Sequence, residues 1–201
     1  MTEHKMNLIT FNKQAKAFFC MRDRKASAQG YVAPLGCIHV SDGWAGATDG
    51  YTLAAHELAY PVADGCWTHE AVPADPKIKT VPWRGILKGE THTGTISADE
   101  VKHLLALALL AERVDPDAYR NCVEIMGDAF SFKLGSLHAS VVLSPAFGSV
   151  DGPVWIRGAN LAKALSLPWF ADGCIIETRG RRGAVSLRTT SALAAVMPLV
   201  R

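Results

Sequence analysis

The residues best suited to metal chemistry are a cysteine and a histidine in the run Cys66-Trp67-Thr68-His69. A thiolate and an imidazole at this spacing can bind zinc, but a zinc site needs two further ligands in a tetrahedral arrangement. No second Cys/His pair with suitable spacing follows, and His92 or His56 would have to be recruited by the fold. We therefore expect no metal and no other cofactor.

Groups suited to acid–base catalysis are equally sparse. Asp49 could pair with Glu57 or Asp42, but these carboxylates lie in predicted turns, where conformation alone favours them. His103 lies on an apolar helical stretch and His138 in a predicted strand, so a packed histidine is a simpler interpretation than a general base. The sequence has no Gly-rich phosphate loop, Gly-x-Ser-x-Gly elbow or metalloprotease helix. We expect no enzyme; a catalytic site under a long loop is a third alternative.

The bulk composition is that of an ordinary globular protein. The 201 residues are 49% hydrophobic and 20% charged, with a formal net charge of +2, so charge alone does not indicate a nucleic-acid binder. Five cysteines, an odd number without paired spacing, suit a reducing cytoplasm. The polar start resembles no signal peptide, and the longest apolar run, Leu104 to Ala111, is far shorter than the ~20 residues that cross a membrane. We expect a cytoplasmic protein with no membrane attachment.

Three stretches of the chain share one order of elements: a short strand, a helix, then a meander of short strands. They run from about Asn7 to Leu58, Thr93 to Ser144 and Val154 to Arg201. Such repetition indicates a fold that uses one supersecondary unit several times. Between the first two lies Pro61 to about Gly94, which has four prolines and no sustained period. This segment predicts a long loop.

The elements of the first stretch follow from apolar spacing and turn residues. Leu8-Ile9-Thr10 predicts a strand, and Thr10 or Asn12 can cap a helix that continues to Lys25. Two Asp-Gly pairs supply the positive φ of tight hairpins. They predict strands over residues 31–40, 44–48 and 51–55.

The other two stretches have the same order of predicted elements. Thr95-Ile96 ends a strand, and Ser97 with Glu100 forms a Ser-x-x-Glu capping box ahead of a helix to about Arg113. A second helix, over 160–167, is stopped by Pro168. Strands are expected over 122–126, 130–133, 137–143, 154–156, 174–178, 184–188 and 194–200.

Two short segments, Ala47-Thr48-Asp49-Gly50-Tyr51-Thr52-Leu53-Ala54 and Ala195-Val196-Met197-Pro198-Leu199, are distinctive. The first is similar to the ATDG-x-x-LA segment, and the second to the C-terminal VVMPM tail, of bacterial DNA sliding clamps, the β subunits of the replicative DNA polymerase. The resemblance implies an α+β, DNA-clamp-like fold: three strand–helix–meander units with antiparallel sheets backed by helices. It implies a clamp-like domain of two units over residues 1–151, with the long loop at about 61–94, and a clamp-like half-domain over 152–201.

In that family, both segments line a pocket where polymerases and other clamp-binding proteins insert a short linear peptide. Here Thr52 stands at the position of the usual basic residue, and the basic residue after the Met-Pro pair is displaced to Arg201. We expect the apolar floor to remain while the polar groups differ; the alternative is that the apolar members are simply core. The implied pocket residues are Thr48, Gly50, Tyr51, Leu53, Met197, Pro198 and Leu199.

Clamps work without catalysis. Helices that line the hole of a ring present Lys and Arg to DNA phosphates, which gives sequence-independent and salt-sensitive contacts. The alternative for any such residue is an ordinary solvated surface. The candidates for phosphate contact are Lys13, Lys16, Arg22, Arg24, Lys25, Lys102, Arg113 and Lys163.

The resemblance implies a protein that encircles or rides on double-stranded DNA and tethers a polymerase or another replication partner. The alternative is a clamp mimic that binds a host replication or defence protein without holding DNA. If a ring needs about a dozen helices, three per chain predict a homo-tetramer, in which a neighbour completes the last half-domain across a two-fold axis. The small size suggests a phage or mobile-element origin.

Overall fold

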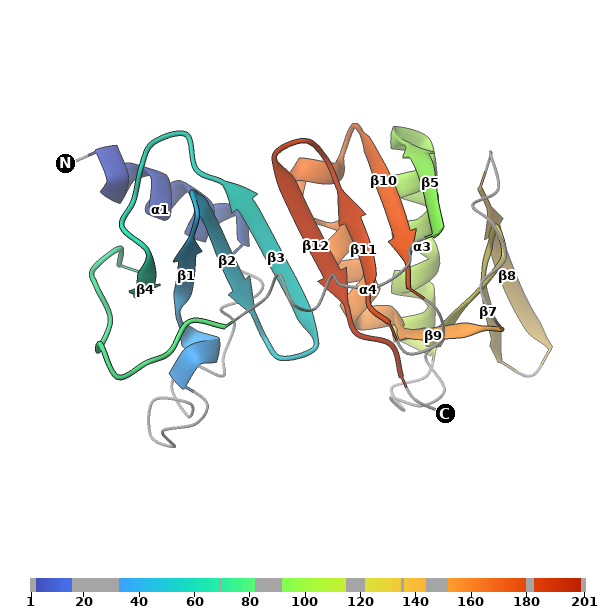
Figure 1. The fold of residues 1–201 in the computed structure, drawn as a ribbon. Coiled ribbons are helices and arrows are strands. Elements are labelled where there is room, and N and C mark those ends of the chain that lie inside the picture. The colour runs from blue at the N-terminus through green and yellow to red at the C-terminus, as the bar shows by residue number, and fades with distance from the viewer. Residues whose placement is uncertain are drawn as a thin grey trace. The chain divides into compact units, whose positions relative to one another are not determined.

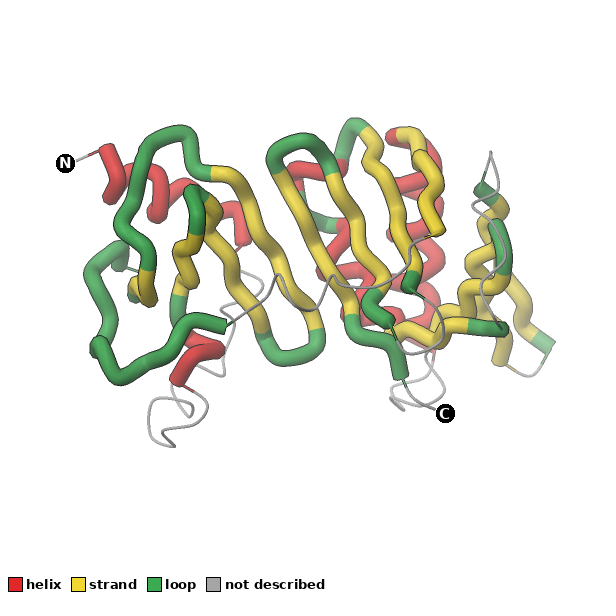
Figure 2. Tube along the Cα trace, viewed as in Figure 1, coloured by secondary structure: helices red, strands yellow, loops and turns green. Residues whose placement is uncertain are grey.

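The computed structural model describes residues 3–15, 33–68, 70–81, 92–114, 122–134, 136–143, 152–179 and 183–199. The chain forms two compact units (Figures 1 and 2). Both contain α-helix and antiparallel strands, so the predicted α+β class is confirmed. Unit 1 comprises Met1–Gly85 and Ser191–Leu193, and unit 2 comprises Ile86–Thr190 and Ala194–Arg201.

Unit 1 is an antiparallel sheet with an α-helix. In the sheet the strands follow the order β4-β1-β2-β3. Leu8 and Phe11 of the helix are buried together with Ile38, Val40 and Leu53 of the strands. The elements are α1 (Glu3–Ala15), the 3-10 helix η2 (Ala33–Gly36), β1 (Ile38–Ser41), β2 (Trp44–Thr48), β3 (Thr52–Glu57) and β4 (Gly65–Trp67).

The predicted strand at Leu8-Ile9-Thr10 is wrong, because these residues lie within α1. Leu8 and Phe11, three positions apart, are both buried, while Thr10 is exposed. This spacing matches one face of a helix and not the two-residue period of a strand. Glu3 in the first turn and Lys13 in the last turn also suit the helix dipole. The predicted continuation to Lys25 lies outside the described residues.

The predicted long loop also contains regular structure. Strand β4 lies inside it and pairs with β1, with Cys66 opposite His39. Its last predicted residues belong to a further strand, β5 (His92–Ser97). Three residues, the length of β4, are too few to show a period, so pairing with β1 rather than a sequence pattern defines this strand.

The turn between β1 and β2 is the tight hairpin that the sequence predicts. Asp42 and Gly43 have φ values of 50° and 78°, and Ser41 pairs with Trp44 across them. Two successive residues of positive φ match the right-handed twist of the flanking strands. The confirmed turn sets which residues of β2 face the core.

Unit 2 has two antiparallel sheets and two packed helices. One sheet has the order β12-β11-β10-β5 and the other β8-β7-β6-β9. Strand β12 contributes its last residues to this unit. The remaining elements are α3 (Ala98–Val114), β6 (Cys122–Met126), β7 (Ala129–Leu134), β8 (Leu137–Val142), β9 (Val154–Arg157), α4 (Gly158–Leu165), the 3-10 helix η4 (Pro168–Phe170), β10 (Gly173–Thr178), β11 (Val185–Arg188) and β12 (Ala192–Val196).

Helices α3 and α4 pack against each other. Leu104 of α3 and Leu161 of α4 are both fully buried. The second and third predicted strand–helix–meander stretches therefore complete each other. The structure thus groups the chain differently from the predicted division at residue 151, which falls between the two helices. Eight residues of α4 are too few to cover a sheet without a second helix.

The start of α3 is fixed by the predicted capping box, which is confirmed. The Ser97 N–H donates to Glu100 Oε2 at 2.6 Å, and the Glu100 N–H donates to Ser97 Oγ at 3.3 Å. These bonds satisfy backbone donors that a helix start leaves free. Strand β5 ends at Ser97 and α3 begins at Ala98, and β9 likewise passes from Arg157 directly into α4 at Gly158.

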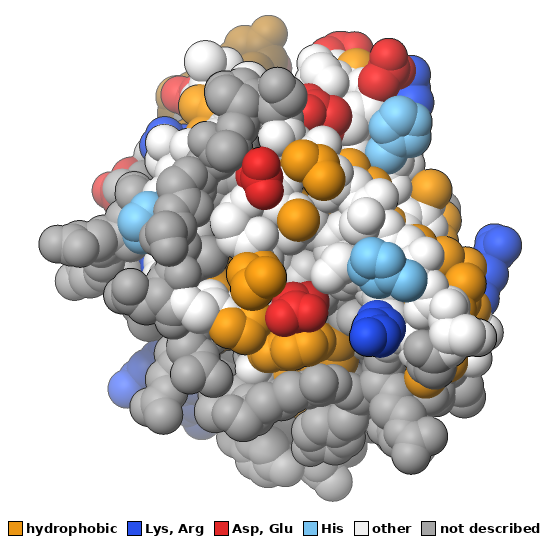
Figure 3. All heavy atoms as spheres, turned by 90° about the vertical axis from the view of Figure 1, so that its right-hand side faces the viewer, with side chains coloured by type: hydrophobic (Ala, Val, Ile, Leu, Met, Phe, Trp, Pro, Cys, Tyr) orange, Lys and Arg blue, Asp and Glu red, His pale blue; other side chains and the backbone are white. Residues whose placement is uncertain are grey.

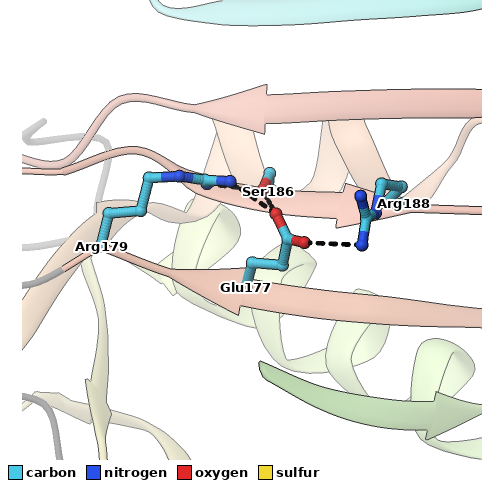
Figure 4. Close-up of polar contacts among 4 residues, drawn as sticks. All are labelled: Glu177, Arg179, Ser186 and Arg188. Atoms are coloured by element: carbon cyan, nitrogen blue, oxygen red, sulfur yellow. Dashed lines mark hydrogen bonds and ion pairs between the residues drawn. The ribbon is translucent and has the colours of Figure 1, made fainter. Parts of the chain in front are cut away.

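The hairpin of β10 and β11 is held by a buried network of polar side chains (Figure 4). Arg179 donates to Glu177 Oε2 at 2.6 Å and to Ser186 Oγ at 2.8 Å. Arg188 contacts the other Glu177 oxygen at 3.1 Å. The Glu177 and Arg179 side chains are each 7% exposed, whereas Arg188 is 52% exposed. Such a buried pair is costly to break, because either charge alone would remain in a dry site.

Replacing Gly173 by alanine should weaken the contact between β10 and β5. Gly173 has a φ of 103°, and a Cβ there would lie 2.6 Å from the Ile96 carbonyl oxygen. Gly43→Ala is the matched control, since Gly43 has a φ of 78° but open space around a Cβ. Urea unfolding should show a loss of about 2–4 kcal/mol for Gly173→Ala and about 1–2 kcal/mol for Gly43→Ala. Equal losses would contradict the assigned contact.

Replacing Glu177 by glutamine should leave Arg179 buried without a counter-charge. We expect the free energy of unfolding to fall by about 3–5 kcal/mol, as for other broken buried pairs. Asp99→Asn is the control, because the Asp99–Lys102 pair has side chains that are 79% and 71% exposed, and it should leave the unfolding midpoint unchanged. If both variants behaved alike in urea, the buried network would not stabilise the hairpin.

Candidate functional site

The tip of the β2–β3 hairpin is the first half of the predicted peptide pocket. The Asp49 carboxylate accepts hydrogen bonds from the N–H groups of Tyr51 and Thr52, at 2.9 and 2.8 Å. Thr48 Oγ1 donates to the Thr52 carbonyl at 2.7 Å and accepts from the Gly50 N–H at 3.0 Å. Gly50 has a φ of 89°, a conformation that glycine adopts without strain. The tip is therefore a fixed loop.

The predicted pocket residues of this hairpin differ in exposure. Tyr51 is 49% exposed, whereas Thr48 is 8% and Leu53 is 2% exposed. Tyr51 can contact a ligand, while Thr48 and Leu53 support the loop from the core. Thr52, at the position of the family's basic residue, is 1% exposed. It therefore adds no polar group to the surface.

The second half of the predicted pocket is the segment that follows β12. Met197 is 39% exposed, and Pro198 and Leu199 are half-buried. The Leu199 N–H donates to the Trp155 carbonyl at 2.8 Å, which fastens the segment to β9. A methionine beside a proline and a leucine gives an adaptable apolar surface. The hairpin tip belongs to unit 1 and this segment to unit 2, so their union into one pocket stays a prediction.

The predicted DNA-contacting residues are described only in part. Lys16, Arg22, Arg24 and Lys25 lie outside the described residues. Lys13 is exposed on α1, Arg113 is exposed near the end of α3, and Lys163 is half-buried on α4.

Lys102 of α3 is already paired with an acidic neighbour. Its Nζ lies 2.8 Å from Asp99 Oδ1, and this hydrogen bond raises the pKa of Lys102 and lowers the pKa of Asp99. Exposed Glu112 also lies beside Arg113 on the same helix. The α3 surface is therefore of mixed charge and not a basic stripe.

The Cys66 thiol, one half of the Cys-x-x-His run, contacts His39 and Ile78. Its Sγ lies 3.5 Å from His39 Nδ1 and donates to the Ile78 carbonyl at 3.4 Å. The Val81 N–H donates to the same His39 nitrogen at 3.2 Å. His69 lies outside the described residues, and the part of the chain that is described contains no group of three or more His, Cys, Asp or Glu that could hold a metal.

Burial raises the pKa of two of the described thiols. The pKa of Cys174 rises to about 12, and the pKa of Cys66 is also raised. Because the thiolate is the reactive form, a raised pKa lowers the fraction of reactive thiolate at neutral pH.

Sequence reasoning missed the buried Glu177 network. The signal was present, since Glu177 and Arg179 stand two positions apart, as do Ser186 and Arg188. Residues two apart share one face of a strand. However, charged residues usually face solvent, so burial of this face could not be inferred.

Comparison with known proteins gives a result for structure only. No protein-family model and no curated protein matches the sequence. The sliding clamp of Bacillus subtilis matches with a TM-score of 0.71 and 11% identity, over 98% of this chain and 63% of that one. The β subunit of DNA polymerase III from Borrelia burgdorferi matches with a TM-score of 0.67 and 12% identity, over 99% and 63%.

A third match is the Helicobacter pylori β clamp bound to a DNA ligase peptide, with a TM-score of 0.64 and 10% identity, over 96% of this chain and 63% of that one. This chain thus spans less than two thirds of the length of these clamps. In its described residues no helix is long and apolar enough to cross a membrane. The antiparallel sheets, the helices that back them and these matches give one conclusion: the chain has the fold of the bacterial DNA sliding clamps, the β subunits of DNA polymerase III.

Proposed function

We propose that this chain is a small sliding-clamp-like protein of the cytoplasm, which encircles or rides on double-stranded DNA and tethers a polymerase or another replication partner. The observation that carries the proposal is the clamp fold over 98% of the chain at a TM-score of 0.71. Burial raises the pKa of the Cys174 thiol to about 12, which fits a tether better than a catalyst that uses this thiol. The work of such a protein is retention on DNA, without bond chemistry.

Weak contact with phosphates suits this role. The net charge is only +2, and Lys102 is partly neutralised by Asp99. Five of the eight candidate basic residues lie between Lys13 and Lys25, so this segment, which begins at the end of α1, is our main candidate for the DNA-facing surface. Few contacts give an affinity that salt easily abolishes. Long residence on DNA would then depend on encirclement.

This chain covers 63% of the Bacillus subtilis clamp. A homo-oligomer would supply the part of a clamp ring that one chain lacks. Among the described residues, unit 2 has two α-helices and two sheets, whereas unit 1 has one α-helix and one sheet. We therefore assign the half-domain to unit 1, in place of residues 152–201, and propose that unit 1 of a neighbouring copy completes it. Four copies would close a ring, as the count of three helices per chain predicts.

We assign the tethering surface to the predicted peptide pocket. Tyr51 and Met197 would contact the ligand, since both are large and exposed. Pro198 and Leu199 would extend the apolar surface, while Thr48, Gly50 and Leu53 hold its shape. The Helicobacter pylori clamp bound to a ligase peptide supports a short linear segment as the ligand. Because Thr52 replaces the usual basic residue, we expect apolar peptide side chains to dominate binding.

The second candidate function is a clamp mimic that binds a host replication or defence protein without holding DNA. The mixed charge of α3, with Lys102 paired to Asp99, is the observation that favours it. A mimic would keep the tethering surface and lose retention on DNA.

Retention on circular DNA tests the main proposal. The protein should stay on a closed plasmid through a moderate-salt wash and leave once the plasmid is cut, because only a free end releases a ring. The double variant Lys13→Glu, Arg113→Glu should bind DNA more weakly and lower the slope of log K against log salt by about 0.9 per lost phosphate contact. The control, Lys77→Glu with Lys79→Glu, changes charge equally at exposed positions and should leave the slope unchanged.

Equal loss from circular and linear plasmid would refute encirclement. Indifference to DNA combined with capture of a replication or defence protein would instead favour the mimic.

Peptide affinity tests the tethering surface. Tyr51→Ala and Met197→Ala should each weaken binding of a clamp-binding ligase peptide by about tenfold, because each removes an exposed anchor. Met126→Ala is the control, since Met126 is 61% exposed but lies on β6, outside the predicted pocket. Isothermal titration measures all three. If Met126→Ala caused the same loss as Tyr51→Ala, the assigned pocket would be incorrect.

A further inference from the structure

The segment of unit 1 that follows β4, residues 70–81, is held to the strands by hydrogen bonds; we call it the strap. Pro73 forms an isolated antiparallel bridge with Trp67, and the Ala74 N–H donates to the Cys66 carbonyl at 2.9 Å. Further along the strap, the Ile78 carbonyl accepts a hydrogen bond from the Cys66 thiol at 3.4 Å. The strap therefore makes its contacts with β4 through both the backbone and the side chain of one cysteine.

His39 of β1 forms a second attachment point for the strap. Its neighbours Ile38 and Val40 point to the opposite face of the strand, and all three side chains are buried, with His39 only 1% exposed. The Val81 N–H donates to His39 Nδ1 at 3.2 Å. The last described residue of the strap is thus hydrogen-bonded to a buried histidine of the sheet.

This hydrogen bond requires a neutral imidazole. A ring nitrogen that accepts a hydrogen bond carries no proton, so the proton of neutral His39 lies on Nε2. Protonation of Nδ1 would turn it into a donor that faces the Val81 N–H, and the bond would be lost. The new charge would also lie in a site with little access to water, which is costly.

The groups that face His39 offer the charged ring little compensation. Strand β2 brings Gly46 opposite His39, and β4 brings Cys66, whose Sγ lies 3.5 Å from Nδ1. Burial raises the pKa of Cys66, so this thiol stays neutral. The 3-10 helix η2 has no titratable side chain. The described charged residues of α1, of the strap and of the turns beside β1 and β4 are exposed: Glu3, Lys13, Asp42, Asp64, Glu70, Asp75, Lys77 and Lys79.

Burial distinguishes His39 from histidines on the surface. Histidine side chains on the face of unit 2 that carries β7 and β8 are open to solvent (Figure 3), and His103 and His138 are exposed. Water solvates the charge when such a ring is protonated, and no strap depends on it. Titration of an exposed histidine therefore leaves the fold around it in place.

We propose that His39 is a pH-sensitive clasp: the neutral ring holds the strap on unit 1, and the protonated ring releases the strap and opens Cys66 to solvent. The released state takes up a proton more readily than the clasped state, because water then solvates the charged ring. Release therefore becomes more favourable as the pH falls below about 6.5, where histidine ordinarily titrates. The strap is the last described part of unit 1 before the chain enters unit 2 at Ile86.

Labelling of Cys66 at different pH values tests the clasp in the full chain. The probe is dithiodipyridine, which reacts with thiols in acid as well as in neutral buffer, and mass spectrometry identifies the labelled cysteine. Each rate is divided by the rate of the same cysteine in the urea-unfolded chain at the same pH, which removes the titration of the thiol itself. From about pH 7.5 to about pH 5.5 the normalised rate at Cys66 should rise by about tenfold.

Two variants change the clasp from its two sides. His39→Asn places an amide oxygen near the position of Nδ1, which can accept from the Val81 N–H but is not protonated in this range, so Cys66 should stay slow at both pH values. Val81→Pro removes the N–H donor, so Cys66 should react fast at both. His138→Asn is the matched control at an exposed histidine, and it should keep the wild-type rise.

Cys37 is the internal reference for local release. It is 5% exposed and lies two positions before His39 in the same unit, so unfolding of unit 1 would label it together with Cys66. An equal rise at Cys37 would overturn the clasp, as would a wild-type rate at Cys66 that does not change with pH. A tenfold rise that persists in His39→Asn would do the same. If circular dichroism showed that His39→Asn is unfolded, Val81→Pro would decide, because an unchanged pH dependence in that variant would also overturn the clasp.

Discussion

The apolar contact between α3 and α4 is the interaction on which unit 2 depends. The two helices also contact the strands of the unit, and Leu104 of α3 and Leu161 of α4 are both fully buried. Without α3, the eight-residue α4 could not form a stable layer. The contact therefore joins stretches on either side of residue 151 into one body.

The two candidate functions, a DNA-holding clamp and a clamp mimic that does not hold DNA, share one fold. The distribution of surface charge would therefore distinguish them better than the fold does. An ion pair is buried in the β10–β11 hairpin, where Glu177 contacts Arg179 and Arg188. Arg179 is buried in this network, whereas Arg188 is 52% exposed. The surface charge of α3 is mixed because Lys102 pairs with Asp99. Under the proposed function, the main candidate for DNA contact is the segment from Lys13 to Lys25, of which Lys13 lies in the described part of the chain.

Elements that depend on short-range interactions were predicted well from the sequence, whereas elements that depend on contacts between distant segments were not. The bounds of β2 and β6, the Asp42-Gly43 turn and the Ser97–Glu100 box match expectation, because short-range hydrogen bonds and positive φ determine them. Leu8 to Thr10 was misassigned because three apolar or β-branched residues suit either a strand or a helix. The three-residue strand β4 depends on pairing with β1. For the site, motif resemblance suggested Tyr51, Leu53 and Met197 as pocket residues, and the structure added that Leu53 and Thr52 are buried while Tyr51 and Met197 are exposed.

The direct passage from strand to helix has a mechanical consequence. β5 enters α3, and β9 enters α4, without an intervening residue, and the Ser97–Glu100 hydrogen bonds lock the first of these junctions. A junction without a loop residue has no flexible segment between strand and helix, so we expect α3 to move with β5 and α4 to move with β9. Unit 2 should therefore resist bending at these two junctions.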